Sequence, residues 1–464
     1  MADHAVVLGA GIAGLTAAAV LADHYATVTV VERDRLPDKP IDRRGAPQGR
    51  HLHSLLSRGS QLLGEFLPGF LADLTAAGAQ VLDDRDMGQI YSRIGAYTFD
   101  RSRPVADPAA LTIYQVTRPF LEFHLRQRLA SMRNVGFREG CDVGEFVSTT
   151  AGHVTGVTVA DRDTRMTETV HADLIVDATG RATRTPLLLE KLGYARPPER
   201  TFTANGVYYS QQITIPDQDR FRERMILVLP EGKAQRGGLV ACEDGKWTLT
   251  VASRANDLGR APTNLAEMWA LAEDFMPTHV HSWLRHAQPQ SEVSTYRYPG
   301  GVWRRYDQMT RYPLGLVVVG DALCSLDPIN GQGMTMATLH ADILRRSMNR
   351  CNCVDPQDFY RQAAAVTGPV WAANARPTVG PAATEAGASL ANRARHWSQR
   401  KILEAAAHDV VVTERLMRVA NFVDPPKRLL DPAFLVRVGA HHASQVLARR
   451  ASWYPPIGGK RERT

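Results

Sequence analysis

The sequence of 464 residues predicts an α/β fold, with a Rossmann-like dinucleotide-binding domain, a mostly antiparallel β-sheet domain and a helical C-terminal region. Three patterns support this prediction. Closely spaced glycines follow a short apolar run near the N-terminus, strand-like segments alternate between residues 195 and 305, and helical periodicity interrupted by prolines fills the region after residue 350. Parallel and antiparallel sheets are therefore expected in one chain.

The N-terminal segment has the order strand, glycine turn, helix. Residues 5–8 are apolar, Gly9 permits the turn, Gly11 lets the backbone approach a pyrophosphate, and Gly14 lets the helix lie close to the strand. A second, β-branched run ends at Glu32, where a carboxylate can accept hydrogen bonds from ribose hydroxyls. This pattern predicts a dinucleotide site without separating FAD from NAD. The residues expected to contact the dinucleotide here are Gly9, Gly11, Ile12, Ala13, Gly14, Glu32 and Arg33.

Two later segments favour FAD over NAD as the dinucleotide. One apolar strand runs into a glycine turn at residues 172–181, and another ends in Gly320-Asp321, followed by Pro328, a Gly-x-Gly and a long helix. An aspartate at the end of a parallel strand can hold a ribityl hydroxyl, and glycine N–H groups before a helix can face an electron-rich ring. The competing interpretation is that the Gly-Asp pair only caps a turn.

These segments together resemble the flavin-dependent group A monooxygenases, over about residues 4–345. The resemblance implies FAD bound across a discontinuous Rossmann domain, with Asp321 on the ribityl chain and the Gly-x-Gly segment beside the isoalloxazine. The chain reads Asp-Ala-Thr-Gly-Arg at 177–181 where many members have Asp-Gly followed by Ser and Arg, a departure that concerns how a nicotinamide donor docks. The further cofactor residues expected from the resemblance are Val143, Gly180, Asp321, Pro328, Gly331, Gly333 and Met334.

The loop at residues 45–53 resembles more closely the subgroup of polyether and terpenoid epoxidases from natural-product pathways. A helix is expected after it, because leucines and a phenylalanine recur at helical spacing. Arg50 lies off this apolar stripe, free to reach the pyrophosphate, and Arg118 at the start of another helix is a second candidate for flavin contact. His51 and His53 also lie off the stripe and are interpreted as structural histidines, with a role near the flavin ring as the alternative.

The region between residues 195 and 305 predicts a sheet laid over the flavin. Strands are expected at 202–215, 225–229, 238–241 and 247–253, and odd-numbered residues of the first share one face. Tyr209, Gln211 and Trp247 are the candidates for the substrate pocket, although aromatic residues in strands often belong to the core. This region holds no compact cluster of His, Asp and Glu that would indicate a general base.

The resemblance implies an FAD-dependent monooxygenase that transfers one oxygen from O₂, through a flavin C4a-hydroperoxide, to a lipophilic natural product. Epoxidation of an alkene is favoured, because it needs no acid or base from the protein. Aromatic hydroxylation and prenyl-chain reduction are alternatives. A halogenase is disfavoured because no Trp-x-Trp occurs, and a non-redox flavoprotein remains a further class. NAD(P)H is the expected donor, directly or through a separate flavin reductase.

Composition limits the other possibilities. The chain has no apolar run long enough for a membrane span and no signal-peptide pattern, which favours the cytoplasm. Residues 341–464 carry 19 Lys and Arg against 10 Asp and Glu, which we interpret as a solvated helical face rather than a nucleic-acid surface. Neither disulfides nor metal are expected, although Cys351 and Cys353 form a Cys-x-Cys pair.

The predicted domains follow from these patterns. The FAD-binding domain comprises residues 1–85, 110–190 and 305–350, the substrate-binding sheet comprises 86–109 and 191–304, and a helical cap comprises 351–464.

Overall fold

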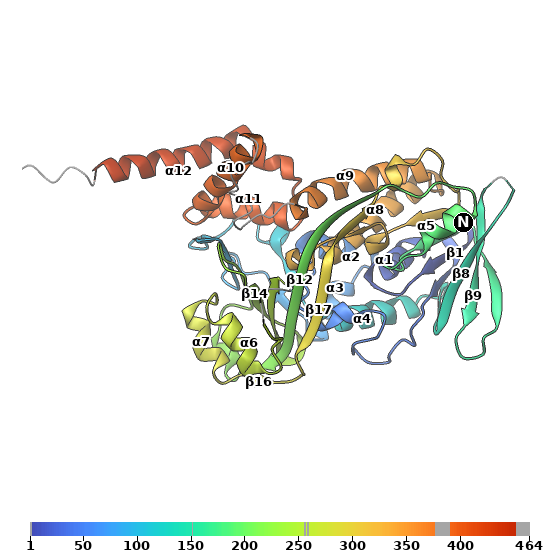
Figure 1. Cartoon of the computed structure of the whole chain (residues 1–464), viewed down its shortest axis with the longest axis horizontal. Helices are drawn as coiled ribbons and strands as arrows, with labels where there is room; N and C mark the ends of the chain where they lie inside the picture. The colour runs from blue at the N-terminus through green and yellow to red at the C-terminus, as the bar shows by residue number, and fades with distance from the viewer. Residues whose placement is uncertain (1, 151, 255–256, 258, 376–389, 452–464) are drawn as a thin grey trace, which may run out of the picture.

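The computed structural model of the chain describes residues 2–150, 152–254, 257, 259–375 and 390–451. It has a Rossmann-like part and a part built on a large sheet, whose long strands β12 (Glu199–Thr214) and β17 (Ser294–Arg304) run side by side toward the Rossmann-like part (Figure 1). No helix among the described residues is long and apolar enough to cross a membrane.

A five-stranded parallel sheet forms the centre of the Rossmann-like part. Its order is β18-β11-β1-β2-β7, so segments from four distant stretches of sequence lie side by side. The carboxyl ends of its strands therefore meet along one edge, where α/β proteins bind ligands. The strands are β1 (Ala2–Leu8), β2 (Tyr25–Val31), β7 (Val135–Arg138), β11 (Leu174–Asp177) and β18 (Leu316–Val318).

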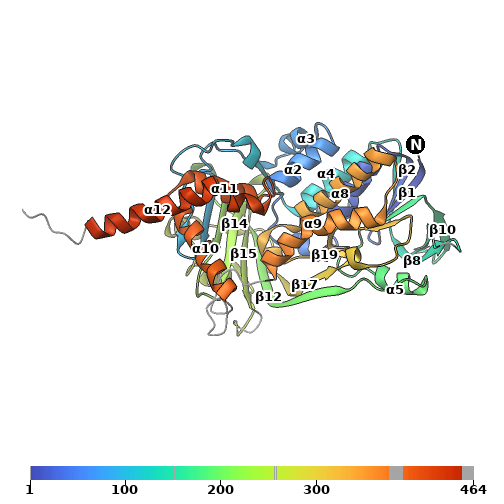
Figure 2. The ribbon, with the colours of Figure 1, turned by 90° about the horizontal axis from the view of Figure 1, so that it is seen from above.

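Helices cover this sheet and a smaller antiparallel sheet, β10-β9-β8, lies beside it (Figure 2). The covering helices are α1 (Ile12–Leu21), α2 (Ser57–Phe66), α3 (Phe70–Ala76), α4 (Arg118–Ala130), α5 (Thr185–Lys191), α8 (Gly333–Cys351) and α9 (Pro356–Asn374). The smaller strands are β8 (Cys141–Ser148), β9 (Val154–Asp161) and β10 (Thr167–His171), with a further pair β3 (Gln80–Leu82) and β6 (Ile113–Gln115).

The second large element is a nine-stranded sheet with the order β19-β17-β12-β15-β14-β13-β4-β5, β16 pairing with β12. It is mostly antiparallel, as expected, but β13 and β4 run parallel. The strands are β4 (Ile90–Ile94), β5 (Tyr97–Thr98), β12 (Glu199–Thr214), β13 (Met225–Leu229), β14 (Arg236–Ala241), β15 (Lys246–Arg254), β16 (Gln288–Pro289), β17 (Ser294–Arg304) and β19 (Cys324–Ser325).

The two faces of this sheet have different partners. The outer face packs on α6 (Leu265–Ala272) and α7 (Thr278–Leu284) in a core that includes Leu239 and Trp247. The inner face turns toward the Rossmann-like part, where Tyr208 and Tyr298 contact Ile329 from a loop of that part. Because successive side chains along a strand point to opposite faces of the sheet, residues two apart lie on the same face and neighbours lie on opposite faces.

The C-terminal helices differ in two places from the sequence prediction. The helical periodicity over residues 398–421 belongs to two helices rather than one, α10 (Leu390–Ala406) and α11 (Val410–Ala420), because Asp409 caps α11 through the Val411 N–H. Pro369, expected to break a helix, lies inside α9. Pro377 and Pro381 lie outside the described residues. Packing also places α9 in the core around the parallel sheet rather than in a separate cap.

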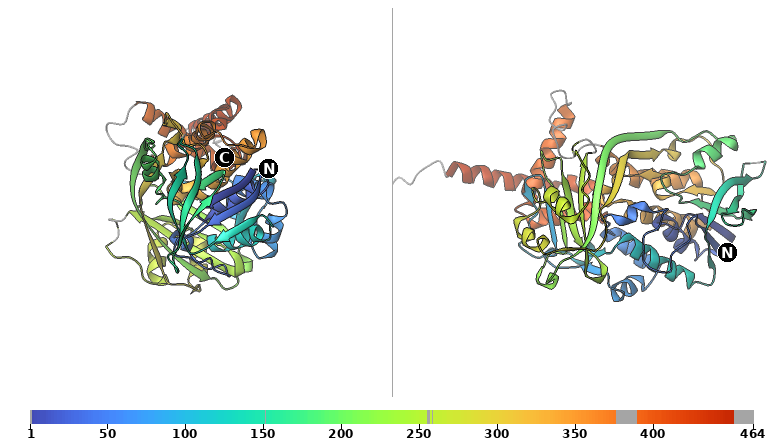
Figure 3. Two further views of the ribbon diagram at one scale, coloured as in Figure 1. Left: turned by 90° about the vertical axis from the view of Figure 1, so that its right-hand side faces the viewer. Right: turned by 60° about the horizontal axis from the view of Figure 1, so that its bottom comes forward.

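The last described helix, α12 (Pro432–Ala451), packs on α10 through Phe434 and extends away from the body of the molecule (Figure 3). Short 3₁₀ helices connect the elements: η1 (Pro47–Arg50), η2 (Ala109–Leu111), η3 (Gln218–Arg220), η4 (Glu243–Gly245), η5 (Tyr306–Gln308), η6 (Gly320–Ala322), η7 (Pro328–Asn330) and η9 (Pro426–Leu430).

A disulfide joins Cys351 and Cys353 at the C-terminal end of α8. The sequence analysis expected no disulfide, because an intracellular chain of this size needs none to stabilise its fold, and this expectation was wrong. The αL conformation of Asn352 between them turns the chain so that the two sulfur atoms meet. Among the described residues, no group of His, Cys, Asp and Glu could hold a metal ion.

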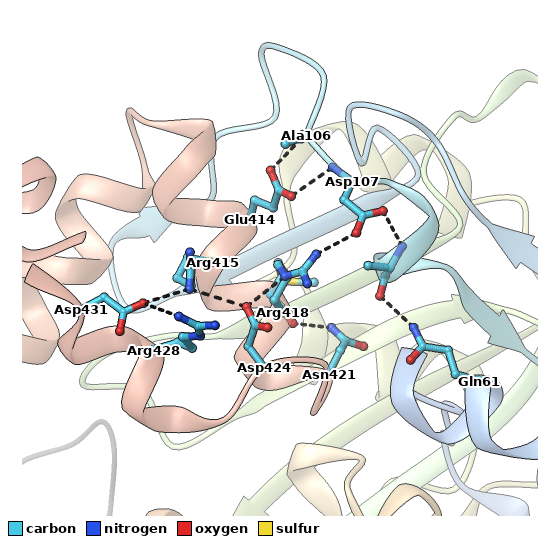
Figure 4. Close-up of polar contacts among 12 residues, drawn as sticks. Gln61, Ala106, Asp107, Glu414, Arg415, Arg418, Asn421, Asp424, Arg428 and Asp431 are labelled. Atoms are coloured by element: carbon cyan, nitrogen blue, oxygen red, sulfur yellow. Dashed lines mark hydrogen bonds and ion pairs between the residues drawn. The ribbon is translucent and has the colours of Figure 1, made fainter. Parts of the chain in front are cut away.

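Helix α11 docks against the 106–107 loop through partly buried polar contacts (Figure 4). The Glu414 carboxylate accepts the N–H groups of Ala106 at 2.7 Å and Asp107 at 3.2 Å. An open groove of about 370 Å³ lies beside them. Each of its guanidiniums lies within 3.5 Å of a carboxylate, which leaves none of these cations unpaired; they belong to Arg415, Arg418 and Arg428.

We expect Glu414→Ala to lower the free energy of unfolding by about 2 kcal/mol, because it leaves two backbone N–H groups without their acceptor. Hydrogen exchange at Ala106 and Asp107 should accelerate. Arg428→Ala is the matched control: its ion pair with Asp431 is half exposed, so the change should stay within about 0.5 kcal/mol. Equal effects of the two substitutions in urea denaturation would contradict this prediction.

Candidate functional site

The glycine turn after β1 has the geometry that the sequence predicted. Gly9 has a φ of +100°, and a Cβ there would lie 2.7 Å from the carbonyl oxygen of Ala178. A Cβ on Gly14 would lie 1.8 Å from the carbonyl oxygen of Gly9, so no other residue fits. Helix α1 starts at Ile12, and its N-cap Gly11 has no side chain to satisfy the first N–H groups. Those N–H groups, with Ile12 and Ala13 in the first turn, can bind an anion.

Glu32 stands at the end of β2, next to this turn. Its carboxylate accepts the Ala10 N–H at 2.7 Å and the Asp34 N–H at 3.0 Å. These bonds fix the carboxylate beside the glycine turn, where the sequence analysis expected a ribose ligand. The neighbouring Arg33 side chain is exposed, and Val143 packs on the core from β8.

Arg43 is a residue of this site that the sequence analysis missed. Its guanidinium is 3.3 Å from Glu32, 3.2 Å from Asp34 and 3.0 Å from Glu122, and its side chain is 8% exposed. A Cβ on Gly11 would lie 3.7 Å from an Arg43 nitrogen. Arg43 therefore places a positive charge at the glycine turn. No periodicity distinguished it from the other arginines of its loop.

Arg118 lies next to Arg43. Its Nε is 2.8 Å from Glu122, and one of its terminal nitrogens would lie 3.4 Å from a Cβ on Gly11. Burial alone would raise the pKa of Glu122, but Arg118 and Arg43 outweigh it and hold that pKa below its ordinary value. The carboxylate is therefore charged and orients both guanidiniums.

Arg50, by contrast, extends into solvent. Its side chain is 61% exposed and lies 3.6 Å from Asp42. The structure thus corrects the expectation that Arg50 supplies the positive charge at the turn, because Arg43 and Arg118 are the guanidiniums beside Gly11. The expected helix does follow the loop, but it begins only at Ser57, and Arg50 ends the short helix η1 before it.

The Asp-Ala-Thr-Gly-Arg segment forms an ordered loop around Asp177. The carboxylate accepts hydrogen bonds from the hydroxyls of Thr179, at 2.6 Å, and of Thr185, at 2.6 Å. Gly180 has a φ of +81° and its Cβ position is open. Arg181 then reaches across to the other part of the chain, where it donates to the carbonyl oxygen of Gly300 at 2.6 Å. The Asp177 carboxylate therefore fixes the conformation of this loop.

Asp321 follows β18 in η6. Among the described residues no group donates a hydrogen bond to its carboxylate. Burial raises the pKa of Asp321, against the opposing effect of Arg118, Arg181 and Arg304. A carboxylate placed this way has its acceptor positions free for hydroxyl donors, which fits a ribityl chain.

His340 supports the turn that carries Asp321. The Gly320 N–H donates to His340 Nδ1 at 3.1 Å, which leaves the proton on Nε2 to be donated to Thr367 Oγ1 at 3.2 Å. The imidazole is fully buried, and burial lowers its pKa to about 4. Neutral His340 therefore fixes the turn that carries Asp321, and its position in the middle of a helix gave no signal for this in the sequence.

The loop before α8 is open toward the site. Cβ positions at Gly331, which has a φ of +62°, and at Gly333 meet no atom within 4 Å. Pro328 is exposed at the start of η7, and Met334 is buried in the first turn of α8. Asn374 of α9 fixes this loop: it accepts the Asp327 N–H at 3.2 Å and donates to Gln332 at 3.0 Å. The glycines thus leave space for a flat ring.

The residues predicted for the substrate pocket lie elsewhere. Tyr209 and Trp247 are buried in the core on the outer face of the large sheet, against α6 and α7. Gln211, two residues after Tyr209 on β12, donates a hydrogen bond to the carbonyl oxygen of Ser291. The even-numbered residues of this part of β12 face the site. Tyr208 donates to Asp327 there, and Ser210 contacts Thr250 at 2.7 Å.

The two histidines of the 45–53 loop are close to this face. His51 Nδ1 is 2.8 Å from Ser210 Oγ, and its ring lies 5.6 Å from that of Tyr296. Burial, with a contribution from Arg50, lowers the pKa of His51 to about 4, and burial lowers that of His53 to about 3. Both are neutral near pH 7. His53 Nδ1 donates to the carbonyl oxygen of His51 at 2.9 Å, and the His53 carbonyl oxygen accepts a hydrogen bond from Gln115.

Residues 7–37 match the NAD(P)-binding Rossmann-like domain. Over 473 residues the chain is 35% identical to Protein Rv3254 of Mycobacterium tuberculosis, in a match that covers 99% of this chain and 98% of the relative.

Three solved structures are similar to the chain. The myxobacterial chondrochloren halogenase CndH has a TM-score of 0.63 and 18% identity, covering 91% of this chain and 97% of that one. p-Nitrophenol 4-monooxygenase PnpA from Pseudomonas putida has a TM-score of 0.61 and 16% identity, covering 92% and 100%. A flavoprotein/dehydrogenase from Cytophaga hutchinsonii has a TM-score of 0.65 and 16% identity, covering 96% and 99%. The chain therefore has the Rossmann-like FAD-binding fold.

We expect His340→Leu to lower the free energy of unfolding by about 2 kcal/mol, because it leaves the buried Gly320 N–H unpaired. Urea denaturation at pH 7.5 measures the change. His286→Leu, at an exposed histidine, is the control and should stay within about 0.5 kcal/mol.

The same variant tests the pH dependence. The unfolded chain takes up the His340 proton near pH 6.5 and the folded chain only near pH 4, so stability falls as the pH drops through this window. The loss attributable to His340 amounts to at most about 3 kcal/mol. We expect the stability of His340→Leu to fall less steeply from pH 6.5 to 4 than that of the unsubstituted protein. Parallel curves would count against a neutral buried imidazole.

Proposed function

Because this chain belongs to the same family as Protein Rv3254 and has the Rossmann-like FAD-binding fold, we propose that it is an FAD-dependent monooxygenase. One observation carries the proposal: two guanidiniums at the glycine turn and an unpaired Asp321 carboxylate lie along the same edge of the parallel sheet. The first suits a pyrophosphate and the second a polyol chain.

The residues present fit FAD along its whole length. The turn from Gly9 to Gly14 with Arg43 and Arg118 would hold the pyrophosphate, Glu32 the ribose, Asp321 the ribityl chain, and the open Gly331–Gly333 backbone the ring. When bound and reduced, FAD supplies the electrons that activate O₂ for transfer of one oxygen atom to a substrate. The protein's part is to position the substrate and to exclude water.

We favour alkene epoxidation of a lipophilic natural product as the reaction. Leu52 of the 45–53 loop supports this, because it is a partly exposed apolar side chain that packs on the buried Met225 and Val240 of the inner face. Transfer of an electrophilic oxygen to an alkene requires no proton removal from the substrate. An apolar surface that orients the alkene is sufficient.

Aromatic hydroxylation is the second candidate, and a specific chain of contacts favours it. His51, Ser210 and Thr250 are linked by distances of 2.8 and 2.7 Å on the substrate side of the sheet. A neutral imidazole at the end of such a chain could accept the proton of a phenol. Reduction of a prenyl chain, the third alternative, would proceed without O₂.

Electrons are proposed to come from NAD(P)H, either directly or through a separate flavin reductase. Arg181 of the Asp-Ala-Thr-Gly-Arg loop donates to Gly300, and its guanidinium lies 5.6 Å from the Tyr298 ring. It is therefore held by the protein rather than free to bind a nicotinamide donor. This arrangement favours a reductase partner.

Asp321→Ala tests the cofactor site. We expect FAD to bind at least tenfold more weakly, since a charged acceptor of a ribityl hydroxyl is lost. The unfolding temperature of the FAD-free protein should not fall, because the substitution removes a buried carboxylate that no residue pairs. Asp274→Ala, with a side chain that is 83% exposed, should change neither quantity. Unchanged FAD affinity in Asp321→Ala would rule out the assigned role.

Turnover under ¹⁸O₂ tests the reaction itself. With NAD(P)H, a flavin reductase and paired alkene and phenol substrates, one labelled oxygen atom per product is expected, in an epoxide for the favoured reaction and in a new hydroxyl for the alternative. His51→Ala should slow only phenol turnover, by about tenfold to a hundredfold, because epoxidation needs no base. Product formation without O₂ would instead support the reductase.

A further inference from the structure

Arg236 begins β14 and lies on the inner face of the nine-stranded sheet. Leu239 and Ala241 on the same strand are buried in the core of the outer face, whereas Val240 belongs to the inner cluster. Arg236 and Val240 are four residues apart on β14, so the Arg236 side chain lies on the same face as Val240, where the substrate is proposed to bind.

The Arg236 guanidinium has no hydrogen-bond or ion-pair partner among the described residues. Every other partly buried arginine side chain in this part of the chain has a hydrogen bond or an ion pair, and the groove at α11 shows this pairing in Figure 4. Arg236 has neither a hydrogen bond nor an ion pair, and its one interaction is the electrostatic effect on Tyr208. A partly buried charge without a partner is unfavourable unless something else supplies the opposite charge.

Strand pairing connects Arg236 to the proposed flavin site. Arg236 pairs with Ala252, Ala252 with Tyr208, and Tyr208 with Tyr296, which makes one row across the sheet. Tyr208 donates to Asp327, in the loop next to the open glycines. Arg236 and Tyr208 are two strand spacings apart, about 10 Å. A ligand of that length would reach from the Arg236 guanidinium to Tyr208, beside the proposed position of the flavin ring.

The residue between these two ends is small and apolar. Ala252 contributes only a methyl group between Arg236 and Tyr208, whereas Val240 and Met225 on the neighbouring strands are buried in the core beneath and support the row from below. The Tyr298 hydroxyl is buried without a partner at the flavin end of the row. The row therefore combines a cation at Arg236, an apolar methyl group at Ala252 and the tyrosine ring of Tyr208.

We propose that Arg236 binds a carboxylate of the substrate, and hence that the substrate is a lipophilic carboxylic acid whose opposite end is oxidised near Tyr208. A carboxylate fits better than a phosphate, because one planar guanidinium offers paired donors and a single positive charge. The inference rests on the proposed oxygenase function for the identity of the reacting end, but the binding of the acid group stands on the sheet alone.

Isothermal titration calorimetry with the FAD-loaded protein at pH 7.5 tests this assignment. Two matched pairs serve as probes, farnesoic acid with methyl farnesoate and cinnamic acid with methyl cinnamate. We expect at least one acid to bind at least tenfold more tightly than its ester. Arg236→Gln should weaken binding of that acid about tenfold to a hundredfold and change ester binding less than twofold, because only the charge-assisted contact is lost.

Two further variants separate this effect from a structural one. Arg236→Lys keeps the charge without the planar fork and should retain part of the preference for the acid. Arg297→Gln removes an exposed arginine of the opposite parity on β17 and should behave as the unsubstituted protein. The proposal is overturned if neither acid binds more tightly than its ester, or if Arg236→Gln keeps the preference. Calorimetry requires neither flavin reduction nor O₂, so a failed oxygenase assay is a separate result.

Discussion

A guanidinium enclosed by carboxylates holds the dinucleotide site together. Arg43 joins Glu32 at the end of β2, Asp34 just after it and Glu122 on α4, all at 3.3 Å or less and all nearly buried. These charges are stable only as a set, because removing the cation would leave three carboxylates in one small volume. The path of the loop from β2 to α2 therefore depends on this interaction, and so do the positions of Arg118 and the glycine turn.

Local patterns predicted much of this architecture. The glycine turns, the strands of the large sheet and the strand ends that carry Glu32 and Asp321 follow from short runs of sequence with defined steric needs. Arg43 was missed because its partners come from segments that meet only in the folded chain. The wrong face was assigned to Tyr209 and Trp247 because both faces of the sheet are covered. Alternation of polar and apolar residues, which normally reveals the buried face, is then weak.

The long strand β12 makes the two parts of the chain one structure. It pairs with β17 from Glu199 to Ser210 and with β15 from Gly206 to Thr214, and the register of the first pairing shifts between Thr203 and Gly206. This irregularity bends the strand where it passes from one part to the other. Arg181 and Arg304 bind backbone carbonyls across the same junction. Tyr208 and Asp327 are thereby held in contact even though they are far apart in sequence.

One buried carboxylate links the two sites more directly. Glu243, in the turn between β14 and β15, accepts the Thr117 N–H at 2.8 Å and also the Thr117 hydroxyl, and Thr117 caps the helix that begins with Arg118. The hairpin that carries Arg236 thus ends on the helix that carries a flavin-site guanidinium. Any ligand that orders this hairpin also stabilises the start of α4, and by thermodynamic linkage the reverse holds. Through this contact, occupancy of either proposed site would affect the other without movement of whole domains.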